Sequence, residues 1–141
     1  MKIVGIGETV FDIVFKDGKP QAAVPGGSVF NAIISLGRTA GTAAASTAPR
    51  VIMATQMGKD NVAEIITGFM RRNNVEITHA ICVEGRQSTI SLAMLDSRND
   101  ARYEFFRDSA MPKFQTPDFE FEPGDILLFG SIFAISPATK L

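Results

Sequence analysis

The sequence contains few of the residues that bind metals or form disulfides. Among 141 residues there is one cysteine, Cys82, and one histidine, His79, so an internal disulfide is excluded and the two form a poor set of metal ligands. Lys and Arg number 14 against 15 Asp and Glu, which leaves no excess of positive charge for nucleic acid. No apolar run approaches the roughly 20 residues of a membrane-spanning helix, and the first residues do not resemble a signal peptide. We therefore expect a protein of the reducing cytoplasm that binds no metal, nucleic acid or membrane.

The sequence does contain enough apolar residues for a folded core. Hydrophobic residues make up 45% and charged residues 21%, proportions typical of one soluble globular unit. Strands alternate with helices, and a hairpin signal lies in 88–108, which favours an α/β sheet with a protruding β element. The Ala- and Thr-rich segment 42–49 is predicted to be a loop. The predicted strands are 2–7, 9–15, 21–24, 51–57, 77–83, 88–96, 101–108 and 126–133, and the predicted helices are 29–39 and about 61–74.

Residues 25–31, Pro-Gly-Gly-Ser-Val-Phe-Asn, combine features of a ligand site. Ser28 is a good N-cap for the helix predicted at 29–39, and Asn31 then falls in the first turn. Free backbone N–H groups, an amide side chain and two glycines that permit close approach therefore share a small volume. Such a volume suits a polyhydroxylated ligand, although a plain turn before a helix explains the same residues.

Two charged residues lie within or beside apolar strands. Asp12 is surrounded by Val, Phe and Ile, so it is either on the exposed face of an edge strand or a carboxylate that a ligand holds. Arg107 follows two phenylalanines, and it is either a solvated hairpin end or a guanidinium aimed at ligand oxygens. The pattern of residues alone leaves both alternatives open.

Three glycine-containing motifs are interpreted as structural. The Gly-Ile-Gly of residues 5–7 lacks the third glycine of a dinucleotide-binding fingerprint, because Val10 occupies that position. The Gly-Lys-Asp of residues 58–60 lacks the Ser or Thr that follows the lysine of a phosphate-binding loop, so we interpret it as a turn and helix cap. Asp125 follows a glycine and precedes a strand, and we interpret it as a turn residue and not a general base.

The last residues predict the start of a helix. Ser136 is a good N-cap, and Pro137 suits the first helical position. Only residues 138–141 follow, about one turn of helix. We therefore expect these residues to be the N-terminal part of a longer protein.

Several segments together resemble a known family. The similarity extends over essentially the whole chain, and it is to the N-terminal half of ribokinase-like (pfkB-type) carbohydrate kinases, most strongly to fructokinase-like members. The segments that carry the resemblance are Gly5–Asp12, Gly26–Asn31, Gly37, Met57–Asp60 and Tyr103–Ala110.

The resemblance implies a mostly parallel sheet flanked by helices, with a small β lid formed by segments around 9–25 and 88–108. It also implies that these segments close over a small-molecule sugar, and that the lid strands could form a homodimer. By the same resemblance, the residues expected to bind the sugar are Asp12, Gly26, Gly27, Asn31 and Arg107.

The resemblance further implies ATP-dependent phosphorylation of a sugar hydroxyl by the full-length protein, with ATP and Mg²⁺ bound outside this segment. The general base of the family is an aspartate in a Gly-Ala-Gly-Asp stretch, which this sequence lacks, so no catalytic residue is assigned and the fragment alone is expected to be inactive. Two alternatives stay open: a non-catalytic module for sugar binding or lid-mediated dimerisation, and a nucleoside kinase of the same superfamily.

Overall fold

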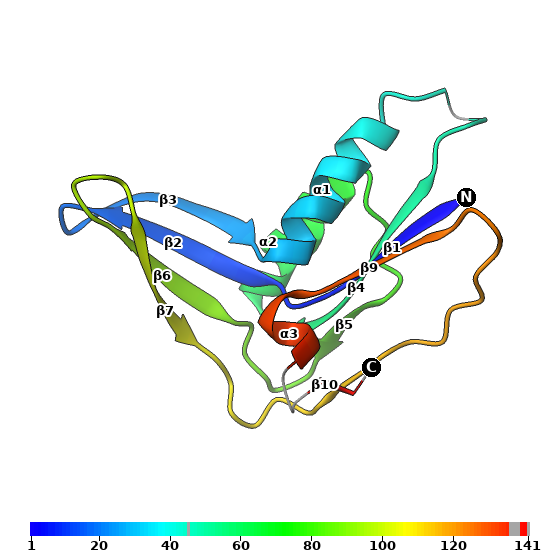
Figure 1. Ribbon diagram of the computed structural model, residues 1–141. Helices are drawn as coiled ribbons and strands as arrows, with labels where there is room; N and C mark the ends of the chain where they lie inside the picture. Colours follow the sequence, from blue (N-terminus) through cyan, green and yellow to red (C-terminus); the bar gives the residue numbers. More distant parts are fainter. Residues whose placement is uncertain (45, 136–138, 141) are drawn as a thin grey trace.

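A four-stranded parallel sheet forms the centre of the molecule. The computed structural model describes residues 1–44, 46–135 and 139–140. The sheet consists of β1 (Lys2–Ile6), β4 (Arg50–Gly58), β5 (Ala80–Val83) and β9 (Ile126–Phe129) in the order β5-β4-β1-β9 (Figure 1). Both β1 and β4 are apolar over nearly their whole length, as expected of parallel strands that are covered on both faces.

Two helices cover one face of this sheet. They are α1 (Ser28–Ala40) and α2 (Asn61–Arg72), and each presents apolar residues at helical spacing to the strands. The side chains of Phe30, Ile33, Ile66 and Met70 are fully buried in this layer with those of Met53 and Met57.

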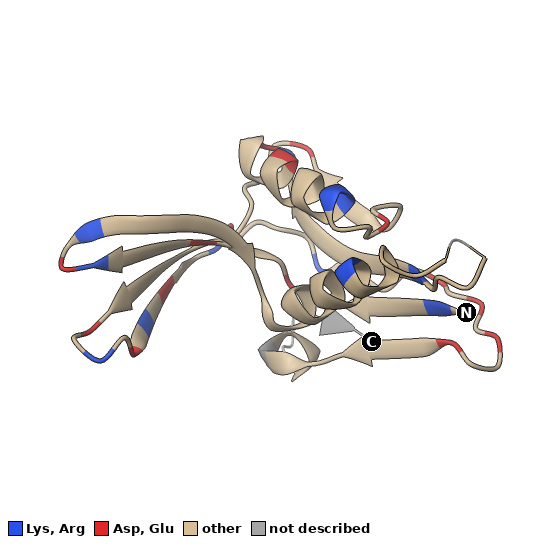
Figure 2. Cartoon of the chain, turned by 90° about the horizontal axis from the view of Figure 1, so that it is seen from above, with Lys and Arg blue, Asp and Glu red and all other residues tan. Residues whose placement is uncertain are grey.

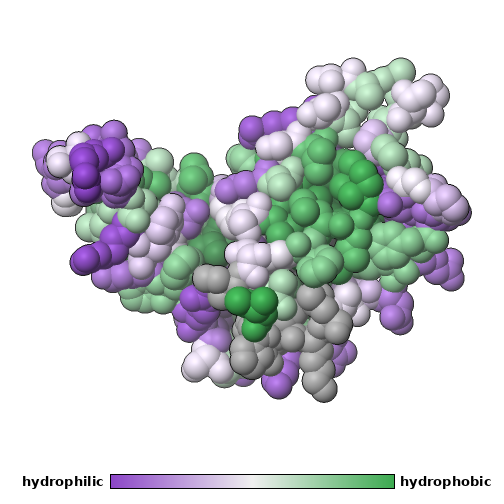
Figure 3. Space-filling model, in the orientation of Figure 1, coloured by the Kyte–Doolittle hydropathy of each residue, from purple (hydrophilic) through white to green (hydrophobic). Residues whose placement is uncertain are grey.

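The other face has a thinner cover. Val4, Ile6, Ile52 and Ala54 pack there against Phe114 of the short strand β8 (Phe114–Gln115) and against Phe119 and Phe133. Strand β8 pairs in parallel with β10 (Thr139–Lys140). On the adjoining edge, three large apolar side chains of β9 are about half exposed: Ile126, Leu127 and Phe129. Figure 3 shows hydrophobic surface over this part of the molecule.

A second four-stranded sheet projects from the first (Figures 1 and 2). Its order is β3-β2-β6-β7, with β2 parallel to β6 and the outer pairs antiparallel. Both of its hairpin turns lie at the far end, where several charged residues occur (Figure 2). We call it the lid sheet, and its strands are β2 (Val10–Lys16), β3 (Lys19–Gly26), β6 (Ile90–Leu95) and β7 (Ala101–Phe106).

The predicted α/β class is confirmed, with differences at element boundaries. The strand predicted at 126–133 is wrong in its second half, because β9 ends at Phe129 and a short helix, α3 (Ser131–Ile135), follows Gly130. The helix start predicted at 136–137 lies outside the described residues, and 139–140 form a strand and not a helix. Within the described part of the chain, no helix is long and apolar enough to span a membrane.

Candidate functional site

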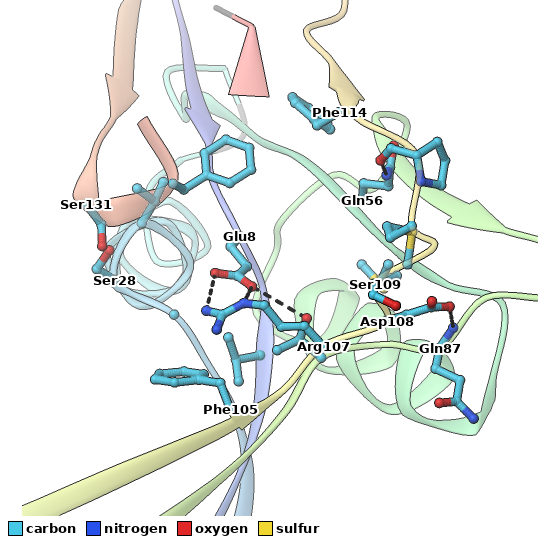
Figure 4. A pocket seen from close by; sticks show the side chains of 18 of the residues that line it. Glu8, Ser28, Gln56, Gln87, Phe105, Arg107, Asp108, Ser109, Phe114 and Ser131 are labelled. Atoms are coloured by element: carbon cyan, nitrogen blue, oxygen red, sulfur yellow. Dashed lines mark hydrogen bonds and ion pairs between the residues drawn. The ribbon is translucent and has the colours of Figure 1, made fainter. Parts of the chain in front are cut away.

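A pocket of about 730 Å³ lies between the central sheet and the lid sheet. It opens at the carboxyl ends of β1, β4 and β9, the position at which parallel α/β sheets bind ligands. The second hairpin of the lid sheet and the segment after it supply the opposite wall (Figure 4). The polar side chains in the lining are those of Glu8, Ser28, Gln56, Gln87, Thr89, Arg107, Asp108, Ser109 and Ser131.

An ion pair joins the two sheets inside this pocket. Glu8 lies two residues after β1, and Arg107 directly follows β7. Nε and one terminal nitrogen of Arg107 donate to the two carboxylate oxygens of Glu8 at 3.0 and 3.2 Å (Figure 4). The guanidinium also lies 4.4 Å from the ring centroid of Phe105, a cation–π distance. Such a two-pronged pair fixes the orientation of both side chains.

The glycine pair allows α1 to begin close to Glu8. Gly27 has φ +118 and is the N-cap residue of α1, and a Cβ built on it would lie 2.5 Å from the backbone oxygen of Glu8. Gly27 is therefore required both by its backbone conformation and by the close approach. The prediction that Ser28 caps the helix is wrong, because Ser28 is the first helical residue and α1 has no side-chain cap.

Asp12 and Gly26 lie together on the lid sheet, beside the residues that line the pocket. The carboxylate of Asp12 accepts a hydrogen bond from the hydroxyl of Ser91, whose side chain is fully buried. The other carboxylate oxygen lies over Gly26, where an added Cβ would overlap it. Gly26 therefore leaves the space that this carboxylate occupies.

Asn31 is exposed in the first turn of α1, and it is not among the residues that line the pocket. Its backbone N–H donates to the carbonyl of Gly27 at 2.9 Å, and its own carbonyl accepts from the hydroxyl of Ser35 at 2.9 Å. The structure thus brings Gly27 and Arg107 into the pocket, places Asp12 and Gly26 next to it, and leaves Asn31 on the outer turn.

Asp60 fastens the start of the second lid hairpin to the central sheet. Its carboxylate caps α2 by accepting from the Ala63 N–H at 2.9 Å, and it accepts from both the N–H and the hydroxyl of Ser88 at 2.7 and 2.8 Å. Burial raises the pKa of Asp60, but the hydrogen bonds from Ser88 and Ala63 outweigh this effect and hold the pKa below its usual value. This confirms the cap assigned to residues 58–60.

Asp108 fastens the other end of the same hairpin. It accepts from the N–H groups of Ala110 at 2.8 Å and Gln87 at 3.1 Å, and it lies 3.9 Å from Arg86. The hydrogen bond from Ala110, followed by that from Gln87, lowers the pKa of Asp108. Asp108 is therefore an ionised carboxylate in the pocket wall at neutral pH.

Asp125 has the structural role that its Gly-Asp turn predicts. It accepts from the backbone N–H of Glu122 at 2.9 Å and that of Lys2 at 2.7 Å, and it pairs with the Lys2 ammonium at 3.0 Å. The hydrogen bond from Glu122, with that from Lys2, lowers the pKa of Asp125 to about 2. A carboxylate with so low a pKa and three partners is a poor proton acceptor.

The side chains that could ligate a metal do not cluster among the described residues. Among residues 1–44 and 46–135, no cluster of three or more His, Cys, Asp and Glu side chains could hold a metal ion. The ring of His79 packs against that of Phe119 at an interplanar angle of 59° with centroids 4.6 Å apart, and Cys82 is exposed and unbridged. In the pocket itself the guanidinium is already paired with Glu8, so it is not free to bind phosphates.

The sequence did not single out Glu8 and Asp108 as pocket residues. Glu8 follows the first strand, where a parallel sheet places ligand groups, and its position is the signal that could have identified it. Asp108 directly follows Arg107 in sequence and could have been named with it. The partner of Glu8 is supplied by a distant part of the chain, whereas one partner of Asp108, Ala110, is local.

The fold is shared with solved sugar kinases. A putative ribokinase from Agrobacterium tumefaciens matches with a TM-score of 0.66 at 16% identity, over 84% of this chain and 40% of that one. An uncharacterized sugar kinase from Pyrococcus horikoshii matches with a TM-score of 0.64 at 18% identity, over 77% and 34%. A fructokinase from Xylella fastidiosa has a TM-score of 0.58 at 18% identity, over 75% and 32%.

The chain therefore spans about a third to two fifths of the length of these proteins. The Pyrococcus kinase has also been solved in complex with ATP, and that structure matches with a TM-score of 0.61. No protein-family model and no curated protein matches the sequence. The expected resemblance to ribokinase-like sugar kinases is confirmed as a shared fold.

Proposed function

We propose that this chain, which has the ribokinase-like fold, is the sugar-binding portion of a kinase that transfers the γ-phosphoryl group of ATP to a hydroxyl of a small sugar. The observation that carries the proposal is the pocket at the carboxyl ends of β1, β4 and β9, which the lid sheet borders in a fold shared with sugar kinases. Closure of the lid sheet over such a pocket would exclude water from a phosphoryl transfer.

The polar residues of the site have the chemistry that sugar hydroxyls require. A carboxylate accepts hydrogen bonds from adjacent hydroxyls, and a guanidinium donates to their oxygens. In the proposal Asp12 and Arg107 supply these two groups, Gly26 and Gly27 allow the ligand to approach the backbone, and Asn31 reaches the ligand from the first turn of α1. Asn31 is exposed, so this last role requires movement of the lid or of the helix end.

The proposal assigns ATP, Mg²⁺ and the general base to the rest of the complete protein. The described residues supply neither a metal cluster nor a free cation in the pocket, and ATP supplies the phosphoryl group in this class of reaction. A cytoplasmic location belongs to the same proposal, since a single cysteine leaves no need for an oxidising compartment.

Calorimetry of the complete protein against fructose, ribose, adenosine and 2-keto-3-deoxygluconate tests the proposal. We expect at least one of these ligands to bind, and Asp12→Ala to weaken that binding at least tenfold, because a carboxylate that accepts from hydroxyls contributes about 1.5–3 kcal/mol. Asp17→Asn is the matched control, since Asp17 has φ 51 in the outer turn of the same sheet and Asn tolerates this conformation. Unchanged affinity in Asp12→Ala would remove Asp12 from the site.

Aromatic side chains in the pocket favour a nucleoside as the second candidate substrate. Phe105, Phe114 and Phe133 all contribute to the lining, and the rings of Phe114 and Phe133 meet edge to face with centroids 5.5 Å apart. Flat rings of this kind can stack on a nucleobase. Tighter binding of adenosine than of fructose and ribose in the same calorimetry would favour this candidate.

The lid sheet also supports the proposal of a homodimer. On one of its faces, apolar residues of β2 and β6 pair in the rows Phe11–Ile90, Ile13–Leu92 and Phe15–Met94. On β7, Phe106 extends the first row, whereas Glu104 and Arg102 end the other two with charged residues. Phe106 and Met94 are 55% and 39% exposed, so a second lid sheet could bury them. Sedimentation of the complete protein tests this proposal. The wild-type protein should sediment as a dimer, and the Met94→Lys variant should sediment as a monomer.

A further inference from the structure

We propose that Glu8 determines the charge specificity of the pocket: by neutralising Arg107 it makes the pocket accept uncharged polyhydroxylated ligands and reject carboxylates. This inference rests on the proposed function, because it concerns the ligand that the same pocket binds. Glu8 acts through Arg107 and is therefore a positioning residue.

The geometry of the pair leaves Arg107 only part of its binding capacity. Both carboxylate oxygens of Glu8 are occupied by the guanidinium, and the hydroxyl of Thr89 lies 3.4 Å from one of them. A carboxylate ligand binds best to arginine through the same two-pronged contact that Glu8 already makes. Single hydroxyl oxygens can still accept from the N–H groups that Glu8 does not use.

The charges around the pocket are all compensated. The only ionisable side chains among its described lining residues are those of Glu8, Arg107 and Asp108. Arg107 is paired with Glu8, and Asp108 has Arg86 at 3.9 Å and two backbone N–H donors. An anionic ligand therefore meets no unpaired positive charge in the pocket.

The pair is exposed enough for a ligand to reach it. The Arg107 and Glu8 side chains are 48% and 29% exposed, and Figure 4 shows the guanidinium and the carboxylate facing the space that the pocket residues surround. Removal of the Glu8 charge alone would therefore leave a guanidinium that an incoming carboxylate can contact directly.

The test measures, by calorimetry, the affinity of the complete protein for two matched ligands. They are D-fructose and 2-keto-D-gluconate, in which the C1 hydroxymethyl group of fructose is oxidised to a carboxylate. The variants are Glu8→Gln, which keeps the shape and removes the charge, and the double variant Glu8→Gln with Arg107→Gln. Within each variant the ratio of the two affinities cancels any loss of folded protein.

We expect the wild-type protein to prefer fructose, and Glu8→Gln to shift the affinity ratio at least tenfold towards the carboxylate. Tenfold is the effect on affinity of the weakest charge-assisted hydrogen bonds. The double variant should lose this shift, and added salt should reduce it. An unchanged ratio in Glu8→Gln, a shift that persists in the double variant, or wild-type binding of the carboxylate 2-keto-3-deoxygluconate in the calorimetry panel overturns the inference while the proposed function stands. Absence of sugar binding by the wild-type protein overturns both.

Discussion

Substitution of Gly26 by alanine should disturb the candidate site with little effect on the fold. Gly26 has an ordinary negative φ, so alanine is not strained there. The new Cβ would overlap the Oδ2 atom of Asp12, which is the end of a flexible side chain and must retreat by more than roughly 1 Å to reach ordinary contact distance. The expected cost in folding free energy is about 1 kcal/mol, from weakening of the hydrogen bond between Asp12 and Ser91.

The expected effect on function is larger, because a displacement of about 1 Å in a positioned group can cost on the order of 10²-fold. We therefore expect Gly26→Ala to lower sugar affinity by about 10- to 100-fold. Gly27→Ala should differ in kind: its φ of +118 and its overlap with the Glu8 backbone oxygen at 2.5 Å leave nothing flexible to move, so the variant should lose about 3 kcal/mol of stability.

Urea unfolding and calorimetry on the same preparations separate the two effects. Gly18→Ala is the control, because Gly18 also has a positive φ, +70, but has nothing within 4 Å of an added Cβ; it should lose about 1 kcal/mol of stability and no affinity. Sugar affinity within twofold of wild type in Gly26→Ala would refute the reasoning, as would a larger loss of stability in Gly26→Ala than in Gly27→Ala.

Two further predictions concern carboxylates outside the ligand contacts. Asp60→Ala should destabilise the protein by about 1–3 kcal/mol in urea unfolding, because α2 loses its cap and Ser88 loses its acceptor; Asp60→Asn should recover part of this, and equal stability of Asp60→Ala and wild type would contradict the role. Asp125 has its folded-state pKa depressed from 3.8 to about 2, so its contribution to stability is fully present above about pH 4 and is lost as the pH falls towards 2. Asp125→Asn should therefore show a shallower loss of stability than wild type in acid unfolding between pH 4 and 2, and parallel curves would contradict this.

The central sheet and its helices could be predicted because their patterns are long and unambiguous. Helix α2 has apolar residues at helical spacing and an aspartate cap, and β1 and β4 are nearly continuous apolar runs. The segment 126–133 was less informative, since a short apolar run is compatible with strand or helix. Gly130 divides it into β9 and α3.

The candidate site could be predicted only where its signal is local. The glycine pair marks the start of α1 from neighbouring residues, and Gly27 does lie in the pocket. The ion pair between Glu8 and Arg107 joins residues 99 positions apart, and no local pattern specifies that these two ends of strands meet. The hydrogen bond between Asp12 and Ser91, 79 positions apart, depends in the same way on the register of β2 against β6.

The most direct test of the central claim is an assay of ADP release by the complete protein in the presence of ATP and Mg²⁺. The assay is run with each sugar of the panel, and the product is identified. The account predicts ADP in a one-to-one ratio with a phosphorylated sugar, and at least tenfold slower release in Asp12→Ala. ADP release that no sugar stimulates, in a protein that calorimetry shows to bind sugar, would contradict the kinase and favour a sugar-binding module.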